Sequence, residues 1–199
     1  MEDGLPDQII LAIAQTPDGY LWLGTPHGLV RFDGFKFSTI SAEVAPTLQE
    51  FGVSCILGAN DGSLWAGSVG GGVTHLMAHT AAHFATEQGL QALTTRVLYQ
   101  AADGTIWVGT DKGLYKQVKD RFQFVGELGT ESVTSIISDG SDGFWVGSDH
   151  LSHYQRGKFL HVTLPPLKSV IRALAIDREG GLWIGSLDKL MVLRKDGSI

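Results

Sequence analysis

The sequence predicts an all-β protein, a β-propeller of about five four-stranded antiparallel blades. Three observations predict this fold. All five tryptophans lie in copies of one motif, the copies recur about every 40 residues, and an apolar run precedes each copy. Internal repeats of this length, each with room for four short strands, are typical of propeller blades.

The repeated motif is an Asp-Gly or Glu-Gly turn followed by Trp-x-Gly-Thr/Ser. The copies read "DGYLWLGT" from Asp18, "DGSLWAGS" from Asp61, "DGTIWVGT" from Asp103, "SDGFWVGS" from Ser141 and "EGGLWIGS" from Glu179. The tryptophans follow one another at spacings of 43, 42, 38 and 38 residues, and they are Trp22, Trp65, Trp107, Trp145 and Trp183. In the fourth copy, the Asp-Gly pair of Asp142 lies one residue nearer the tryptophan than in the other copies.

Four strands follow in order within each copy. The apolar run, such as "IILAIAQ" or "GVSCILG", is expected to be the innermost strand, because nearly continuous apolar residues suit a strand covered on both faces. The Asp-Gly pair then reverses the chain. The second strand carries the tryptophan, which we expect between neighbouring blades, and the glycine after it permits close approach. Turns such as "PHG" and "DG" lead to the third and fourth strands.

These elements place the whole chain, residues 1–199, in one domain. The predicted blades cover residues 8–42, 51–86, 94–126, 132–163 and 169–199, and the last outer strand is incomplete. Five blades could form a ring closed by the N-terminal segment, or an arc of a larger ring. An open arc would expose strand edges and favour self-association. No signal peptide is present, and because the chain opens directly into a repeat, we expect it to be cut from a longer protein.

Composition excludes several classes of partner. The net charge is −6, with 21 acidic and 15 basic residues and no Lys/Arg run, which argues against nucleic acid. The longest strongly apolar run, "IILAIA", is far too short to span a membrane, so this segment is not expected to contact one. The single cysteine, Cys55, permits no internal disulfide and is expected to be a small buried apolar residue.

One segment carries a family likeness. "GLPDQIILAIAQTPDGYLWLGTPHGLVRFDG" closely resembles the two-component regulator propeller repeat, whose motif is Asp-Gly-x-Leu-Trp-x-Gly-Thr followed by Gly-Leu. The resemblance implies a periplasmic or extracytoplasmic sensor region of a bacterial signalling protein, with output domains such as a histidine kinase beyond it. It implies a non-catalytic module without a cofactor. The expected partner is a small molecule or saccharide, or a protein.

Two alternatives remain beside this interpretation. The first is a propeller that serves as a protein-interaction scaffold. The second is an enzyme, because streptogramin-lyase-like propellers are similar in their repeat signature, and their chemistry requires His and acidic groups around a magnesium ion. His27 and His150 occupy corresponding turns and are the candidates for that role, but no lyase motif surrounds them. Likeness of fold is a poor basis for assigning function.

Ligand contacts are expected at the turns between the second and third strands. These turns meet on one face of a propeller, and loops on a fixed frame commonly carry recognition. For each residue the simple alternative is solvation. The candidates are His27, Asp111, Lys112, Asp149, His150, Asp188 and Lys189.

Two arginines lie at one repeat position of the innermost strands. Arg96 and Arg172 could face the central channel and hold an anionic ligand. The alternative is that they pair with acids such as Glu131 or Asp177. The same position holds Leu11 and Ser54 and, counted from Asp142 in the fourth blade, Ser135.

Three histidines, His75, His79 and His83, stand four residues apart. On a helix this spacing would align three zinc ligands. The phase of the repeat instead places them on the third strand, a turn and the fourth strand of the second blade, where they need not share a face. We therefore predict no metal site and regard these histidines as part of a solvated blade edge.

Overall fold

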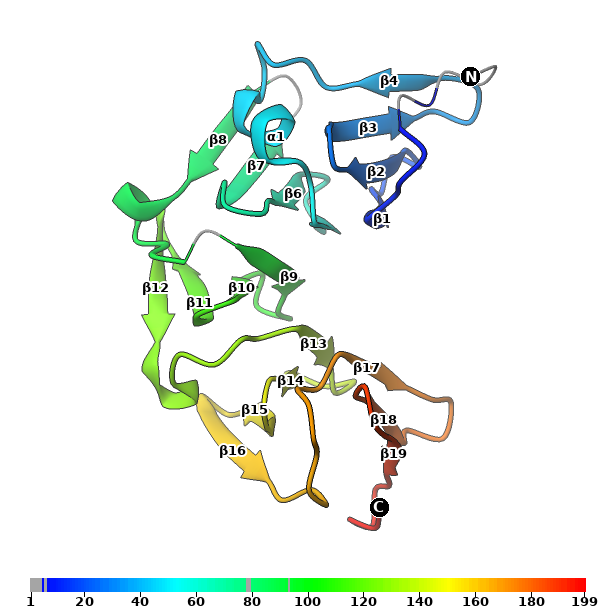
Figure 1. Ribbon diagram of the computed structural model, residues 1–199, viewed down its shortest axis with the longest axis vertical. Helices are drawn as coiled ribbons and strands as arrows, with labels where there is room; N and C mark the ends of the chain where they lie inside the picture. Colours follow the sequence, from blue (N-terminus) through cyan, green and yellow to red (C-terminus); the bar gives the residue numbers. More distant parts are fainter. Residues whose placement is uncertain (1–4, 6, 78–79, 93) are drawn as a thin grey trace.

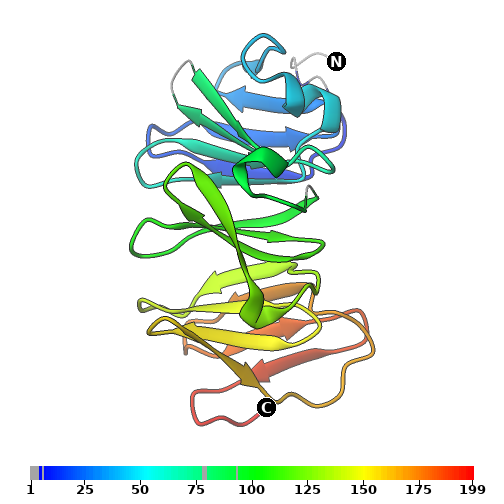
Figure 2. The ribbon, with the colours of Figure 1, turned by 90° about the vertical axis from the view of Figure 1, so that its left-hand side faces the viewer.

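The structure is a computed structural model that describes residues 5, 7–77, 80–92 and 94–199. Five antiparallel sheets follow one another along an arc, and Figure 2 shows them in chain order from blue to red. Their innermost strands contact one another in sequence, from blade 1 to blade 5 (Figure 1). The predicted all-β propeller architecture is confirmed.

Each sheet is a simple meander in which neighbouring strands are consecutive in the chain. Blade 1 contains β1 (Ala12–Gln15), β2 (Leu21–Thr25), β3 (Gly28–Phe32) and β4 (Phe37–Thr39). Blade 2 contains β5 (Cys55–Gly58), β6 (Leu64–Gly67), β7 (Val73–Met77) and β8 (Thr80–Phe84). Blade 3 contains β9 (Thr95–Gln100), β10 (Ile106–Thr110), β11 (Gly113–Val118) and β12 (Arg121–Val125). Blade 4 contains β13 (Ser135–Ser138), β14 (Phe144–Gly147), β15 (Leu151–Gln155) and β16 (Lys158–Val162). Blade 5 contains β17 (Ala173–Ile176), β18 (Leu182–Gly185) and β19 (Leu190–Leu193).

Short helices occupy three of the segments between blades, and the sequence did not predict them. α1 (Pro46–Phe51) lies between blades 1 and 2, η1 (Thr86–Gln88) between blades 2 and 3, and η2 (Gly126–Leu128) between blades 3 and 4. Pro46 begins α1, where a missing backbone N–H costs no hydrogen bond, and Leu48 is buried in the hydrophobic cluster between blades 1 and 2. No helix in the described part of the chain combines the length and apolar character that crossing a bilayer requires.

The turn between the first and second strands requires a left-handed residue. Gly19 has φ 90°, and its N–H donates to the carbonyl of Thr16 at 2.9 Å. In the fourth blade the Asp142-Gly143 pair lies in this turn, as the sequence predicted, but Gly143 is not its left-handed residue. The turn spans Asp139 to Gly143, whose carbonyl accepts from the N–H of Asp139, and because Asp142 stands at the position of Gly19, the glycine with positive φ is Gly140.

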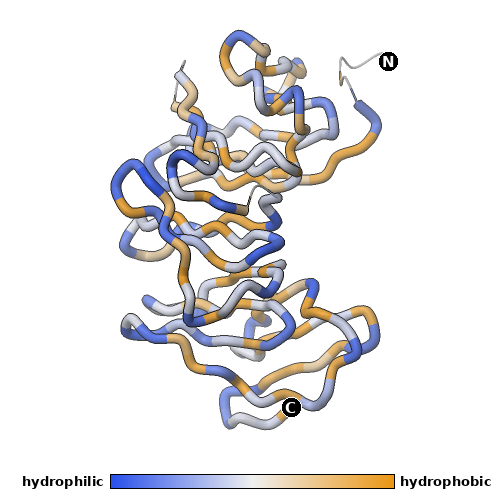
Figure 3. The backbone as a smooth tube through the Cα atoms, turned by 60° about the vertical axis from the view of Figure 1, so that its left-hand side comes forward, coloured by the Kyte–Doolittle hydropathy of each residue, from blue (hydrophilic) through white to orange (hydrophobic). Residues whose placement is uncertain are grey.

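The hydrophobic core consists of four clusters, one at each interface between consecutive blades. Figure 3 shows hydrophobic residues along the strands and hydrophilic residues mainly at the turns. Trp107 packs against Phe144 and Tyr154 of blade 4, with ring centroids 4.9 and 5.2 Å away. Trp65 packs in the same way against Phe122 of blade 3. The predicted placement of these tryptophans between blades is confirmed.

Backbone hydrogen bonds join the blades at a second repeated position. In the first four motifs, the carbonyl of the final Thr or Ser accepts from the N–H of a residue just before or at the start of the next innermost strand. Each of these four bonds is 2.9 Å long, and they run from Val53 to Thr25, Thr95 to Ser68, Val133 to Thr110 and Ile171 to Ser148.

The glycine after each tryptophan permits this close approach. A Cβ on Gly67 would lie 2.5 Å from Thr95 Cγ2, and one on Gly109 would lie 2.7 Å from Val133 Cγ1. Cys55 packs in the same layer, and burial raises the pKa of its thiol to about 12. This cysteine therefore behaves as an apolar side chain, as the sequence predicted, although it is half-buried and not fully buried.

The arc does not close. Blades 1 and 5 lie at its two ends (Figure 1), and the faces that they turn toward the gap are exposed. Trp183 of blade 5 is 39% exposed, whereas Trp65 and Trp107 are 3% and 4% exposed. Of the two arrangements that the sequence left open, the structure has the arc.

Candidate ligand-binding site on the turn face

The turns between the second and third strands place all seven candidate residues at one end of the blades. In three of these turns a side chain is bonded to the segment that precedes its own blade. His27 Nδ1 lies 2.7 Å from Asp7 Oδ2, and His150 Nδ1 lies 3.2 Å from Glu131 Oε2. These bonds join residues 20 and 19 positions apart, so they are a repeated feature of the blade.

In blade 5 the corresponding turn is also bonded to the preceding segment, but through an aspartate and not a histidine. Asp188 Oδ1 accepts from Ser169 Oγ at 3.3 Å, and Asp188 Oδ2 accepts from the backbone N–H of Lys168 at 3.2 Å. Although desolvation opposes it, hydrogen bonds from Ser186 and Lys168 lower the pKa of Asp188. The hydrogen bond with His27 likewise lowers the pKa of Asp7.

The turn of blade 3 is held differently. The N–H of Asp111 donates to the carbonyl of Thr94 at 3.1 Å, and the N–H of Lys112 donates to Thr110 Oγ1 at 3.1 Å. Asp111 Oδ1 is buried and has no hydrogen-bond partner among the described residues. Asp111 and Lys112 are therefore held by their backbone.

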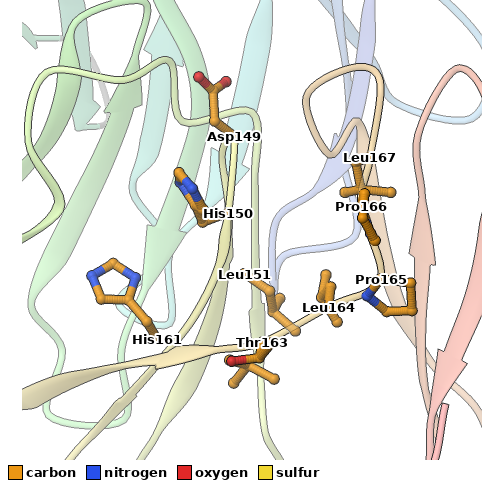
Figure 4. A pocket seen from close by; sticks show the side chains of 10 residues that line it. Asp149, His150, Leu151, His161, Thr163, Leu164, Pro165, Pro166 and Leu167 are labelled. Atoms are coloured by element: carbon orange, nitrogen blue, oxygen red, sulfur yellow. The ribbon is translucent and has the colours of Figure 1, made fainter.

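The turn of blade 4 borders a cavity of about 370 Å³. Two predicted residues, Asp149 and His150, line it together with His161 and Thr163 of the outer strand and the segment after it. Figure 4 shows the two imidazoles on one side of the cavity and the chain from Leu164 to Leu167 on the other. The remaining lining side chains are Leu151, Val162, Leu164, Pro165, Pro166 and Leu167.

The two imidazoles are held by bonds through their Nδ1 atoms. His161 Nδ1 lies 3.1 Å from Ser152 Oγ, and His150 Nδ1 bonds to Glu131. The ring centroids are 6.2 Å apart, and neither Nε2 atom has a partner within the described residues. Two imidazole nitrogens and a carboxylate beside an apolar wall can bind a small molecule that carries hydroxyl or carboxyl groups.

The other predicted residues do not line this cavity, although one of them, Lys189, contacts the segment that forms its apolar wall. Lys189 Nζ donates to the carbonyl of Pro166 at 2.6 Å, so this lysine fixes the segment that forms the apolar wall. His27, Asp111 and Lys112 lie in the turns of blades 1 and 3, away from the cavity. His161 and Thr163 were not among the residues expected to contact a ligand, because that expectation was limited to the turns between the second and third strands.

Arg96 and Arg172 are exposed at the inner edge of blades 3 and 5. Neither forms an ion pair within the described residues. The acids expected to pair with them have other partners, since Glu131 bonds to His150 and Asp177 accepts from Trp183 Nε1 at 2.9 Å. The expectation of those pairs is not met.

Hydroxyl side chains occupy the same repeat position in blades 2 and 4. Ser54 Oγ donates to the carbonyl of Thr95 at 2.8 Å. In blade 4 the residue is Thr134, whose hydroxyl donates to the carbonyl of Ile171. Counting back from Asp142 assigned Ser135 to this position. That assignment is wrong by one residue, because Asp142 lies one residue nearer the tryptophan than the acidic residue of the other turns.

The histidines of blade 2 do not converge. His75 lies opposite Ala82 and stacks on Trp65 with ring centroids 4.0 Å apart, whereas His83 lies opposite Thr74 and so points to the other face of the sheet. His79 is outside the described residues. Within the described residues no group of three or more His, Cys, Asp or Glu could hold a metal ion.

The two histidines considered for a lyase lie in different blades. His27 is in blade 1 and His150 in blade 4, and each pairs with a carboxylate that precedes its own blade. This arrangement gives each imidazole a structural partner and does not bring the pair together around one ion.

A second, larger hollow of about 740 Å³ opens at the opposite end of the blades, between blades 1 and 2. Trp22 lines it with Tyr20 and Leu76. In blade 4, the residue equivalent to Leu76 is Tyr154, which packs on Trp107. The smaller leucine leaves Trp22 partly uncovered, so the hollow results from a change in packing.

Comparisons with known proteins agree with this architecture. Residues 4–27, 89–112 and 165–188 match the family described as "Two component regulator propeller", so the chain carries repeats of that family. No curated protein sequence matches the chain.

Three solved structures are similar in fold. The extracellular domain of the putative hybrid two component system BT3049 from B. thetaiotaomicron has a TM-score of 0.76 at 23% identity, over 92% of this chain and 26% of that chain. Virginiamycin B lyase from Staphylococcus aureus has a TM-score of 0.75 at 12% identity, over 100% of this chain and 69% of that one. The extracellular domain of the putative one component system BT4673 from B. thetaiotaomicron has a TM-score of 0.61 at 19% identity, over 98% and 33%. The chain thus spans about a quarter of the first of these proteins.

Proposed function

We propose that this chain, which carries two-component regulator propeller repeats, is a ligand-sensing module of a bacterial signalling protein. It acts outside the cytoplasm, without catalysis, and binds a small molecule at the cavity beside blade 4. The repeat family and the likeness to extracellular domains of two-component and one-component systems support the signalling role.

The observation that carries the ligand site is the convergence of His150, His161 and Asp149 at one cavity. The cavity volume of about 370 Å³ falls within the range that small-molecule sites occupy. Its mixture of an apolar wall with a few polar groups is also typical of such sites. A ligand with hydroxyl or carboxyl groups, such as a saccharide or an organic acid, fits this lining.

The test is a thermal-shift screen with a panel of small saccharides and carboxylic acids. Any compound that raises the Tm is then titrated against the variants His161→Gln and His27→Gln. His161→Gln removes an imidazole from the cavity, whereas His27→Gln changes the corresponding turn region of blade 1 and serves as the matched control.

We expect binding to weaken at least about tenfold in His161→Gln, because a hydrogen bond worth about 1.4 kcal/mol is lost, and to persist in His27→Gln. Equal affinity in both variants, or no Tm shift with any member of the panel, would contradict the proposed site.

A further inference from the structure

The hollow between blades 1 and 2 lies at an interface that lacks an aromatic ring present at the next two interfaces. Phe122 of blade 3 packs against Trp65, and Phe159 of blade 4 packs against Trp107, each with ring centroids 6.2 Å apart. The strand register places Ala81 of blade 2 at the position of these two phenylalanines. Blade 2 therefore presents a methyl group to the tryptophan of blade 1, where blades 3 and 4 present a ring to the tryptophan before them.

A second covering ring is replaced on the side of blade 1. In blades 2 and 4 the residue opposite the tryptophan is a histidine, whose imidazole stacks on the indole with ring centroids 4.0 Å apart. The corresponding residue of blade 1 is Arg31, which lies opposite Trp22. Its guanidinium lies over the ring of Tyr20, 4.5 Å from the centroid. Trp22 therefore lines the hollow without a ring stacked on it from the opposite strand.

The hollow has the size and the wall that a small aromatic molecule requires. Its volume of about 740 Å³ falls within the range of small-molecule sites. Leu76, at the position of Tyr154 in blade 4, leaves further space beside the same indole. Trp22 Nε1 donates to Thr16 Oγ1 at 2.9 Å, which fixes the orientation of the indole. Because aromatic rings pack favourably on one another, the ring of a ligand can replace the rings that blade 2 lacks.

Charged groups of both signs border the same hollow. Arg31 forms no ion pair within the described part of the chain, so its N–H donors are open to a ligand. Asp18 and Asp61 use Oδ1 for hydrogen bonds within their own turns, and neither Oδ2 has a partner among the described residues.

These groups match a zwitterion. A guanidinium binds a carboxylate through two parallel N–H donors, and a carboxylate accepts from an ammonium group. Hydrogen bonds from Ser63 lower the pKa of Asp61, which keeps this carboxylate ionised. The lining therefore suits a ligand that carries a carboxylate, an ammonium group and an aromatic ring.

We propose that the hollow between blades 1 and 2 binds an aromatic amino acid. The ring of the ligand packs on Trp22, in the space that the small side chains of blade 2 leave. Its carboxylate binds the guanidinium of Arg31, and its ammonium group binds the carboxylates of Asp18 and Asp61. This site lies at the opposite end of the blades from the cavity beside blade 4 and is independent of the function proposed for that cavity.

The test is isothermal titration calorimetry of the 199-residue chain with L-phenylalanine. Three further compounds each lack one of its groups: 3-phenylpropanoate lacks the ammonium group, 2-phenylethylamine lacks the carboxylate, and L-alanine lacks the ring. We expect L-phenylalanine to bind at least about tenfold more tightly than each of the three, because each loses one of the contacts.

Two substitutions locate the bound molecule. Leu76→Tyr fills the hollow with the ring that blade 4 carries at this position, and Arg31→Gln removes the cation. Each should weaken the binding of L-phenylalanine at least about tenfold. Two controls should leave this binding unchanged. Leu190→Tyr adds the same ring outside the hollow, and Lys116→Gln removes a cation at the equivalent position of blade 3.

Four results would overturn the proposal. The first is the absence of binding at L-phenylalanine concentrations up to about 10 mM. The second is equal affinity in Leu76→Tyr and Leu190→Tyr, because the molecule would then lie outside the hollow. The third is loss of binding in His161→Gln without an effect of Arg31→Gln, which would assign the molecule to the cavity beside blade 4. The fourth is binding of 2-phenylethylamine as tight as that of L-phenylalanine, since the carboxylate would then make no contact.

Discussion

Trp107 and Trp183 occupy the same position of the same repeat, yet their surroundings differ. Trp107 is 4% exposed and packs against the aromatic rings of Phe144 and Tyr154 in the next blade. Trp183 is 39% exposed and has only its own blade around it, where its Nε1 donates to Asp177. The motif therefore encodes one half of an interface, and the following blade supplies the other half.

The contrast between interior interfaces and end faces has consequences for stability. A residue at an interior interface contributes through the apolar surface that it buries, whereas the same residue at an end face buries little. Identical substitutions at equivalent positions should therefore have unequal effects along the chain.

The largest difference is expected for the tryptophans themselves. Trp107→Ala should lower the free energy of unfolding by about 3 kcal/mol, at the lower end of the range for such changes, because the buried Nε1 lacks a partner among the described residues. Trp183→Ala should lower it by less than about 1 kcal/mol. Urea denaturation at low protein concentration measures both, and equal losses would remove the distinction between the two sites.

The glycines after the tryptophans give a second matched pair. Gly67→Ala should cost about 1–3 kcal/mol, because its Cβ would lie 2.5 Å from Thr95 Cγ2 and 2.6 Å from Cys55 Sγ. Gly185→Ala meets no such contact and should raise stability by about 0.5 kcal/mol through the lower entropy of the unfolded chain. Thermal unfolding of the two variants gives the comparison, and strong destabilisation by Gly185→Ala would show that this face is covered.

The interface between blades 1 and 2 is intermediate, because a hollow leaves Trp22 partly uncovered. Leu76→Tyr introduces the residue that blade 4 carries at the same position, and it should raise the free energy of unfolding by about 0.5–1 kcal/mol. Leu190→Tyr on the uncovered face of blade 5 is the control and should leave stability unchanged. A loss of stability in Leu76→Tyr would mean that the hollow cannot hold the ring.

The smallest effect concerns pH at the interior interface of Trp65. Burial lowers the pKa of His75 from 6.5, and the charge of Asp61 only partly opposes this. As the pH falls, His75 therefore binds a proton in the unfolded chain before it does so in the folded protein. The stability that neutral His75 contributes is present above pH 6.5 and is lost as the pH falls below it.

His75→Phe keeps a ring on Trp65 and removes the titration. Its free energy of unfolding should fall less than that of the wild type between about pH 7.5 and pH 5.5. Burial lowers the pKa of His83 as well, but that residue is present in both proteins and cancels in the difference. Identical pH profiles would show that folding does not lower the pKa of His75.

The repeat made most of the fold predictable from sequence. Five copies of one motif fixed the order of strands and turns, and the tryptophan spacing placed the side chains between blades. The helix α1 was not predictable, because its six residues are held by the burial of Leu48 in the cluster between blades 1 and 2. The exposure of Trp183 also depends on a neighbour that no single repeat describes.

The candidate site was predictable only in part. The phase of the repeat placed Asp149 and His150 on the turn face. His161 lies in the outer strand and approaches this turn only because β16 pairs with β15, which sets His161 opposite Ser152. Contacts that arise from strand pairing in an irregular blade cannot be read from turn positions alone.

The chain forms an open arc whose end faces are uncovered. Hydroxyl-radical labelling followed by mass spectrometry measures the exposure of all five tryptophans in one sample of folded protein at low concentration. We expect Trp183 to be labelled fastest, Trp22 and Trp145 more slowly, and Trp65 and Trp107 slowest. Labelling of Trp183 as slow as that of Trp107 would contradict the open arc.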